Sequence, residues 1–210
     1  MPDRASTVFI VDDDISVRES LEALMQAVGW EARTFASAQD FLSCPASLGP
    51  SCLVLDVSLP GLSGLDLQTR LVRERGDMPI IFITGYGDVP MSVRAMKAGA
   101  VEFLTKPVSD DALLAAVEGA IERSREALGQ AAELRVMREC HDSLSPREKE
   151  VMALVVSGLL NKQVGFELGI SEITVKVHRG RVMGKMRVRS LAELVRMSVR
   201  LRLGDPPEQI

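Results

Sequence analysis

The chain has 210 residues, of which 46% are hydrophobic and 26% are charged, and its formal net charge is -4. No stretch approaches the roughly 20 apolar residues of a membrane span. The N-terminus lacks the basic and then apolar pattern of a signal peptide, so we expect a globular protein that does not bind membranes. The three cysteines lack metal-ligand spacing, which indicates free thiols in a reducing compartment such as the cytoplasm.

The two halves of the chain differ in charge. Residues 1–125 hold 11 basic and 18 acidic residues, for a net charge of -7, whereas residues 126–210 have a net charge of +3. Nine basic residues fall within 176–202, where Glu193 is the one acidic residue. This asymmetry favours two domains that bind different partners.

The first half alternates between strand and helix patterns. Continuous apolar runs near 7–11, 52–56, 79–84 and 101–104 are typical of strands in a parallel sheet covered on both faces, and a further short strand is predicted over 31–35. Helices are predicted over 16–28, from 38, over 65–73, over 90–98 and from Asp110, and Val28 is expected on the buried face of the first. Five repeated βα units predict a doubly wound α/β domain with five parallel strands.

The stretch from Asp111 to about Cys140 is helical in pattern for an unusual length. One interpretation is a last helix that runs into a polar linker. The other is a continuous helix used for dimer contact or signal transfer. The first is slightly favoured, because a strict heptad is not sustained.

The second half predicts four helices, over about 146–156, 161–168, 171–186 and 190–203. Ser145, Pro146 and Glu148 occupy the N-cap, N1 and N3 positions of a strong helix start. A short helix, a turn near Gly169 and a longer basic helix form a helix-turn-helix pattern. The alternative is an amphipathic helix with a solvated basic face. On the longer helix the residues expected to pack inward are Ile173, Val177 and, with less support, Val182 and Met186.

Five polar residues follow the predicted strands and form a candidate site: Asp12, Asp13, Asp56, Thr84 and Lys106. Ligands of such sheets bind outside the carboxyl ends of the strands, so these residues should converge. Carboxylates suit Mg²⁺, and one of them can attack phosphorus when the phosphoryl charge is offset. Lys106 and Thr84 could bind the phosphoryl oxygens. Each residue alone is more simply a strand-end or surface residue; the joint pattern supports the site.

At these residues the chain resembles bacterial two-component response regulators. The matching motifs are Val-Asp-Asp-Asp at 11–14, Leu-Asp at 55–56, Leu-Pro-Gly-Leu-Ser-Gly at 59–64, Ile-Thr-Gly at 83–85 and Thr-Lys-Pro at 105–107. The resemblance implies a flavodoxin-like receiver domain over 5–123 that catalyses only its own phosphorylation and dephosphorylation. It implies that Asp56 accepts a phosphoryl group from a sensor histidine kinase, and that Lys106-Pro107 is a cis peptide.

The same resemblance implies a metal site and a switch. Mg²⁺ (or Mn²⁺) would be held by Asp12, Asp56 and the backbone carbonyl of Ser58, with Asp13 bound directly or through water. Thr84 and Phe103 would form the switch pair that moves on phosphorylation. Val108 departs from the family pattern, since many receivers carry Phe there, and its smaller side chain could loosen the packing near the site.

The second half resembles the LuxR-type helix-turn-helix domain of the FixJ/NarL family. The matching motifs are Leu-Ser-Pro-Arg-Glu at 144–148, Asn-Lys-Gln at 161–163, Leu-Gly-Ile-Ser at 168–171 and Thr-Val-Lys-Val-His at 174–178. The sequences of these motifs, and of residues 84–93 in the first half, most resemble the FixJ subgroup. The resemblance implies a DNA-binding domain over 143–203, joined by a helical linker over 124–142. The chain departs from the family pattern at two glycines. The resemblance implies a position for a basic base-reading residue at Gly180, and at Gly165 Ala is usual, whereas Gly costs about 1 kcal/mol in helix propensity.

The resemblance also implies individual DNA contacts. Lys176 and Val177 would face bases, and Thr174, Arg179 and Arg181 would contact phosphates. His178 is either a further DNA contact or a satisfied interior histidine.

The implied function is a transcription regulator, and not an enzyme, that dimerises on phosphorylation. Its partners would be a sensor histidine kinase, promoter double-stranded DNA, RNA polymerase and a second copy of the chain, with activation favoured over repression. The first alternative is a phosphorylation-independent dimeric DNA-binding regulator with a receiver-like domain. A second is a phosphatase or other enzyme in the acidic pocket, which would leave the helix-turn-helix unexplained.

Overall fold

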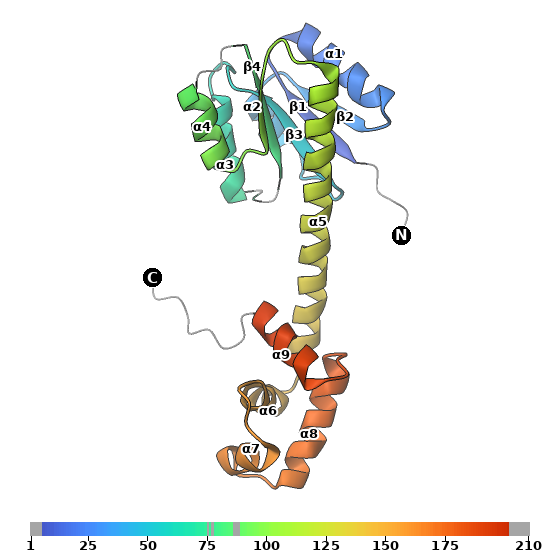
Figure 1. Cartoon of the computed structure of the whole chain (residues 1–210), viewed down its shortest axis with the longest axis vertical. Coiled ribbons are helices and arrows are strands. Elements are labelled where there is room, and N and C mark those ends of the chain that lie inside the picture. The colour runs from blue at the N-terminus through green and yellow to red at the C-terminus, as the bar shows by residue number, and fades with distance from the viewer. Residues whose placement is uncertain (1–5, 75, 77, 86–88, 202–210) are drawn as a thin grey trace. The chain divides into compact units, whose positions relative to one another are not determined.

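The computed structural model describes residues 6–74, 76, 78–85 and 89–201. The chain divides into two compact units, Met1–Gly129 and Gln130–Ile210, and each is described by itself (Figure 1). The FixJ-like segment 84–93 includes residues 86–88, which lie outside the described residues, as does the predicted end of the last helix beyond residue 201.

The first unit is the predicted doubly wound α/β fold. All strand pairings are parallel and the strand order is β2-β1-β3-β4-β5, which confirms the five-stranded prediction. The strands are β1 (Thr7–Val11), β2 (Glu31–Phe35), β3 (Ser51–Asp56), β4 (Ile80–Thr84) and β5 (Glu102–Thr105), and the helices are α1 (Ile15–Ala27), α2 (Ala38–Ser43), α3 (Gly64–Glu74), α4 (Val89–Lys97) and α5 (Asp110–Asp142).

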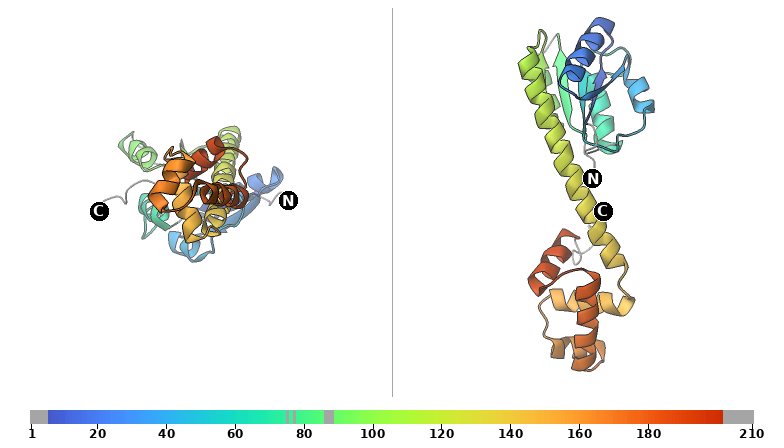
Figure 2. Two further views of the ribbon diagram at one scale, coloured as in Figure 1. Left: turned by 90° about the horizontal axis from the view of Figure 1, so that it is seen from below. Right: turned by 90° about the vertical axis from the view of Figure 1, so that its right-hand side faces the viewer.

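Helices cover both faces of this sheet because successive strand side chains point to opposite sides. One face packs Phe9, Leu53 and Phe82 against apolar residues of α2, α3 and α4. The other packs Ile10 and Val54 against α1 and α5. Figures 1 and 2 show these two helices on the same side of the sheet. The central strands therefore read as unbroken apolar runs.

Two helical predictions for this unit need correction. In α1 the fully buried residue is Met25, whereas Val28 is 48% exposed, because the helix ends at Ala27 and Val28 lies beyond it. The favoured interpretation of residues 111–140, a helix ending in a polar linker, is also wrong. The structure has one helix, α5, through Asp142. Its sequence contains no proline and is rich in Ala, Glu, Leu and Arg, which favour helix, and it tolerates Gly129.

The second unit is all-helical around its own core. Its helices are α6 (Pro146–Val156), α7 (Asn161–Leu168), α8 (Glu172–Lys185) and α9 (Leu191–Arg200), as predicted in number and order. The predicted capping box of Ser145 and Glu148 is present at the start of α6. The core joins these helices to the end of α5 through Cys140, Val151, Val164, Val175 and Leu194.

No helix in the described part of the chain is long and apolar enough to cross a membrane. None of the three cysteines, Cys44, Cys52 and Cys140, is in a disulfide, and all three are buried, as expected from their spacing.

Candidate functional site

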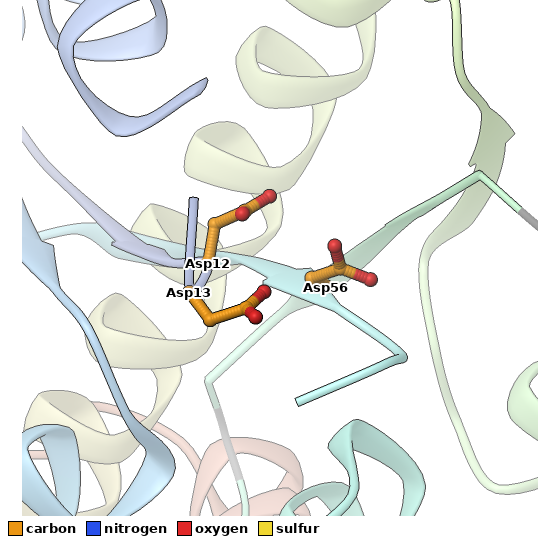
Figure 3. Close-up of side chains that lie close together, drawn as sticks. All are labelled: Asp12, Asp13 and Asp56. Carbon is orange, nitrogen blue, oxygen red and sulfur yellow. The ribbon is translucent and has the colours of Figure 1, made fainter. Parts of the chain in front are cut away.

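Three carboxylates gather at the carboxyl ends of β1 and β3. The register pairs Val11 with Leu55, so Asp12 and Asp56 leave neighbouring strands at the same level. Asp12, Asp13 and Asp56 each offer an oxygen within 4.8 Å of the others, and Figure 3 shows their side chains close together. Asp12 and Asp56 are buried, whereas Asp13 is exposed. The structure thus brings together the predicted carboxylates.

Lys106 joins two of these carboxylates from the loop after β5. Its Nζ donates to Asp12 Oδ2 and to Asp56 Oδ2, at 2.7 Å each. Its backbone N–H donates to the Thr84 carbonyl at 2.8 Å, which holds the loop against the end of β4. Thr84 is fully buried there, and the Lys106-Pro107 peptide is cis, as expected. All five predicted residues therefore lie at one edge of the sheet.

At this edge of the sheet the carboxylates outnumber the one ammonium group that pairs with them. Burial raises the pKa of Asp12, although the hydrogen bond from Lys106 opposes this. Burial alone would lower the pKa of Lys106, but its hydrogen bonds to Asp12 and Asp56 outweigh burial, so the pKa is raised and the ammonium form is favoured. Three ionised carboxylates and one ammonium carry a formal charge of about -2, which suits a divalent cation.

Arg18, on the first turn of α1, is a residue that the sequence analysis missed. Its Nη1 donates to the backbone carbonyls of Asp12 at 2.7 Å and Asp13 at 2.9 Å. The Asp14 N–H donates to Asp12 Oδ1 at 2.9 Å, and Asp14 in turn caps α1. These bonds fix the backbone that carries two of the carboxylates. The sequence did offer a signal for this role, because Arg18 follows the run of three aspartates by four residues and lies on a predicted helix.

The backbone after Asp56 is held just as closely. The Ser58 N–H donates to Asp56 Oδ1 at 2.9 Å, and the Gly64 N–H donates to the Val57 carbonyl at 3.0 Å. A β-carbon on Gly64 would overlap the Asp56 carbonyl oxygen and lie 3.0 Å from Val57 Cα. Gly64 is a second residue that the sequence analysis quoted in a motif without assigning it a role.

The proposed switch residues lie on neighbouring strands. β4 and β5 pair Phe82 with Phe103, and the two rings lie 6.2 Å apart between centroids. Phe103 is half-buried. Val108 lines an open hollow of about 290 Å³ between α1 and the start of α5, next to Lys106.

The second candidate site is a helix-turn-helix formed by α7 and α8. Gly169 ends α7 in the left-handed conformation, with φ of 65°, and the Ser171 side chain caps α8. A β-carbon on Gly165 would lie 2.7 Å from the Ile170 carbonyl oxygen. The glycine expected only to weaken α7 therefore permits the close approach of the turn.

The inward face of α8 differs from the prediction. Val175, Val182 and Met186 are buried, whereas Ile173 is 75% exposed and Val177 is 48% exposed. The prediction of Ile173 and Val177 as inward residues is wrong, and that of Val182 and Met186 is confirmed. Both sets recur at helical spacing, so periodicity alone could not choose between them.

The residues predicted to contact DNA occupy different surroundings. Arg181 is exposed, and the exposed Lys176 pairs with Glu172 at 3.1 Å. Arg179 is half-buried and donates to Asn161 Oδ1 at 3.1 Å. In the same helix Thr174 Oγ1 lies 2.8 Å from the Ser171 hydroxyl. His178 is half-buried, and its Nδ1 has no hydrogen-bond partner among the described residues.

One basic residue at the end of α8 belongs to the fold. Lys185 Nζ donates to Glu148 Oε2 at 2.7 Å and to the Ser143 carbonyl at 3.0 Å. The hydrogen bonds from Lys185 and from the Ser145 N–H lower the pKa of Glu148 to about 2. Arg147, the residue before Glu148 in the first turn of α6, donates to the Leu168 carbonyl at the end of α7, at 2.5 Å. The first turn of α6 therefore holds both helices of the helix-turn-helix.

Two families match the two units. The family described as "Response regulator receiver domain" matches residues 8–118, and the one described as "Bacterial regulatory proteins, luxR family" matches residues 142–198. The chain belongs to the response regulators. It is 56% identical over 191 residues to Nodulation protein W of Bradyrhizobium diazoefficiens, across 91% of this chain and 84% of that protein. It is 42% identical over 193 residues to Transcriptional regulatory protein FixJ of the same organism, across 92% and 94%.

Solved structures of response regulators agree. The response regulator StyR matches with a TM-score of 0.83 at 46% identity, over 93% of this chain and 99% of that chain. Full-length FixJ from B. japonicum matches with a TM-score of 0.56 at 41% identity, over 95% and 98%. The predicted family and fold are thereby confirmed. As a response regulator with a LuxR-type DNA-binding domain, the chain is a transcriptional regulator and not an enzyme, and its family implies a sensor kinase and DNA as partners.

Proposed function

We propose that this response regulator accepts a phosphoryl group on Asp56 from a histidine kinase in the cytoplasm, dimerises, and binds promoter DNA to regulate transcription. Activation through RNA polymerase is the proposed output. The proposed boundaries are 5–123 for the receiver, 124–142 for the helical linker and 143–203 for the DNA-binding domain. The family matches at residues 8–118 and 142–198 support a receiver and a DNA-binding domain in this order.

The observation that carries the proposal is the contact of Lys106 with both Asp12 and Asp56 beside Asp13. Receiver domains bind Mg²⁺ through such an acidic cluster. Oxygens that share one Mg²⁺ at about 2.1 Å lie roughly 3 to 4 Å apart, so the carboxylates need only a small adjustment. In our proposal Asp12, Asp13, Asp56 and the Ser58 carbonyl hold Mg²⁺ or Mn²⁺, which would offset the charge of the phosphoryl oxygens.

The residues of the chain then have distinct roles in the transfer. A carboxylate oxygen of Asp56 attacks phosphorus as the bond from phosphorus to the kinase histidine nitrogen breaks, and that nitrogen recovers a proton. Lys106 turns its ammonium from the carboxylates to the phosphoryl oxygens, where it acts as a compact point charge. The Thr84 hydroxyl donates to the same oxygens.

The switch follows from the position of Thr84 on β4. A move of its side chain toward the phosphoryl group vacates space at the end of β4, and Phe103 on β5 turns inward into it. The Phe103 ring is half-buried and already packs beside Phe82, so it can become more buried when this space opens. The surface of α4 and β5 changes as a result, and we propose that it forms the dimer.

The proposed output is bivalent DNA binding. In each copy α8 enters the major groove, with Lys176 and Val177 at bases and Thr174, Arg179 and Arg181 at phosphates. His178 is a further proposed contact; because its Nδ1 is buried, the other ring nitrogen would have to reach the DNA. Dimerisation raises the affinity for paired half-sites because the second contact becomes intramolecular.

The test is phosphorylation by acetyl phosphate with Mg²⁺, followed by intact-mass spectrometry and by sizing of the complex. Asp56→Asn should gain no phosphoryl group and should not dimerise. Asp111→Asn, at an exposed position of α5, serves as the matched control and should behave like the unchanged chain. Equal phosphorylation of Asp56→Asn would disprove the site. Unchanged dimerisation and DNA binding of Asp56→Asn would instead favour the phosphorylation-independent regulator.

A further inference from the structure

The outermost residues of α8 are apolar or small rather than charged. The buried residues Val175, Val182 and Met186 fix which side of the helix faces the core. At about 100° per residue, the side opposite them carries four residues within an arc of roughly 60°. These residues form what we term the outer stripe of α8: Ile173, Val177, Gly180 and Gly184, all of them exposed.

Charged residues flank the outer stripe. Lys176 lies on one side of it and Arg181 on the other, and both are exposed. A helix in the major groove presents its outermost residues to the base edges, and long charged side chains beside them can reach either base edges or phosphates. The uncharged stripe is therefore placed where the bases lie, with Lys176 and Arg181 beside it for the base and phosphate contacts proposed above.

The two glycines leave the helix slim at this surface. A β-carbon on Gly180 or Gly184 would meet no atom within 4 Å, so the space in front of each is open. Neither glycine has a positive φ that would require it. A stripe without side chains over the last two turns allows the backbone to approach the floor of a groove closely.

We infer that Ile173 is a specificity-determining residue that reads the 5-methyl group of a thymine in each half-site; this rests on the proposed function. Ile173 is in the first turn of α8, and residues at the N-terminal end of a recognition helix contact base edges. Its side chain can form no hydrogen bond with phosphates or bases. The apolar group that the major groove displays is the thymine methyl. A side chain 75% exposed in the free protein gains most when it is covered there.

The test uses the full chain, treated with acetyl phosphate, to select its preferred sites from random duplexes. Each thymine of the selected site is then replaced in turn by deoxyuridine, which lacks only the methyl group. At one thymine per half-site the dissociation constant should rise about fourfold, the factor that corresponds to burying one such group. Ile173→Ala should bind the thymine and deoxyuridine duplexes equally well.

Phe166→Ala is the matched control, since Phe166 is an exposed apolar residue on the neighbouring helix α7. It should keep the fourfold preference for thymine. The inference is overturned if the unchanged chain selects a site in which no thymine methyl matters, or if Ile173→Ala retains the preference. Failure to select any sequence would overturn the proposed function itself, so the two failures are distinguishable.

Discussion

The carbonyl oxygen of Asp56 lies against Gly64, at a distance that leaves no room for a β-carbon. The first residue of α3 is thus packed directly on the backbone of the proposed phosphoacceptor. A larger residue would push either α3 or the end of β3 away, and both are parts of the rigid frame that aims the carboxylate.

We predict that Gly64→Ala destabilises the receiver by about 1 to 3 kcal/mol, the usual cost of overpacking, and slows its phosphorylation by acetyl phosphate. Gly119→Ala is the control, since a β-carbon there would meet no atom and should stabilise α5 by up to about 1 kcal/mol. Urea unfolding and phosphorylation rates measure both effects. Equal stability of Gly64→Ala and the unchanged chain would contradict the close contact.

Arg18→Met should weaken Mg²⁺ binding by about 10- to 100-fold, the range found when groups that orient metal ligands are removed. The reason is that Arg18 holds the backbone carbonyls of Asp12 and Asp13. Calorimetric titration with Mg²⁺ measures the affinity directly. Arg123→Met removes the same charge from an exposed position of α5 and should leave the affinity close to that of the unchanged chain. An unaltered affinity in Arg18→Met would show that the loop needs no such support.

The second unit should lose stability in acid because of Glu148. Its pKa is about 2 in the folded chain against an ordinary value of 4.5, so its contribution is complete above pH 4.5 and is lost as the pH falls toward 2. Lys185→Met should reduce this shift and move acid unfolding to higher pH. Methyl NMR signals of Val151 and Val155 in the full chain report on it. Lys176→Met removes an exposed pair with Glu172 instead, and should leave the acid transition in place.

The two arginines of α8 should differ in their effects on DNA binding. The affinity for DNA falls as the salt concentration rises. Arg181 is exposed, so Arg181→Met should make the slope of log affinity against log salt less steep by about 0.9 per subunit, as expected for one lost phosphate contact. Arg179 is held by Asn161, so Arg179→Met should also lower the melting temperature. The slopes are compared by titrating DNA with each variant at salt concentrations from about 50 to about 200 mM. A salt slope unchanged by Arg181→Met would remove it from the phosphate contacts.

Much of the receiver could be predicted because its signals are local and redundant. Apolar runs reveal buried parallel strands, and polar residues at their carboxyl ends must meet at one edge of the sheet. Asp12, Asp56 and Lys106 converge for this reason. The roles of Arg18 and Gly64 could not be predicted from these patterns, because each acts through contacts with backbone atoms, which leave no pattern in the spacing of apolar residues.

The second unit shows where periodicity is insufficient. Ile173 with Val177, and Val175 with Val182, both recur at helical spacing, and only the packing of α6 and α7 decides which set is buried. The continuity of α5 was underestimated for a related reason. A heptad pattern indicates packing against a partner helix, so its absence does not mean that the helix ends. Residues with high helix propensity can keep an exposed segment such as that of α5 helical.

The ammonium of Lys106 serves as a built-in counter-ion for Asp12 and Asp56. Two buried carboxylates side by side would otherwise repel each other, and the chain resolves this with its own side chain. In the proposed transfer, a divalent cation held by the same carboxylates would take over this charge balance and would leave the lysine available to the incoming phosphoryl group.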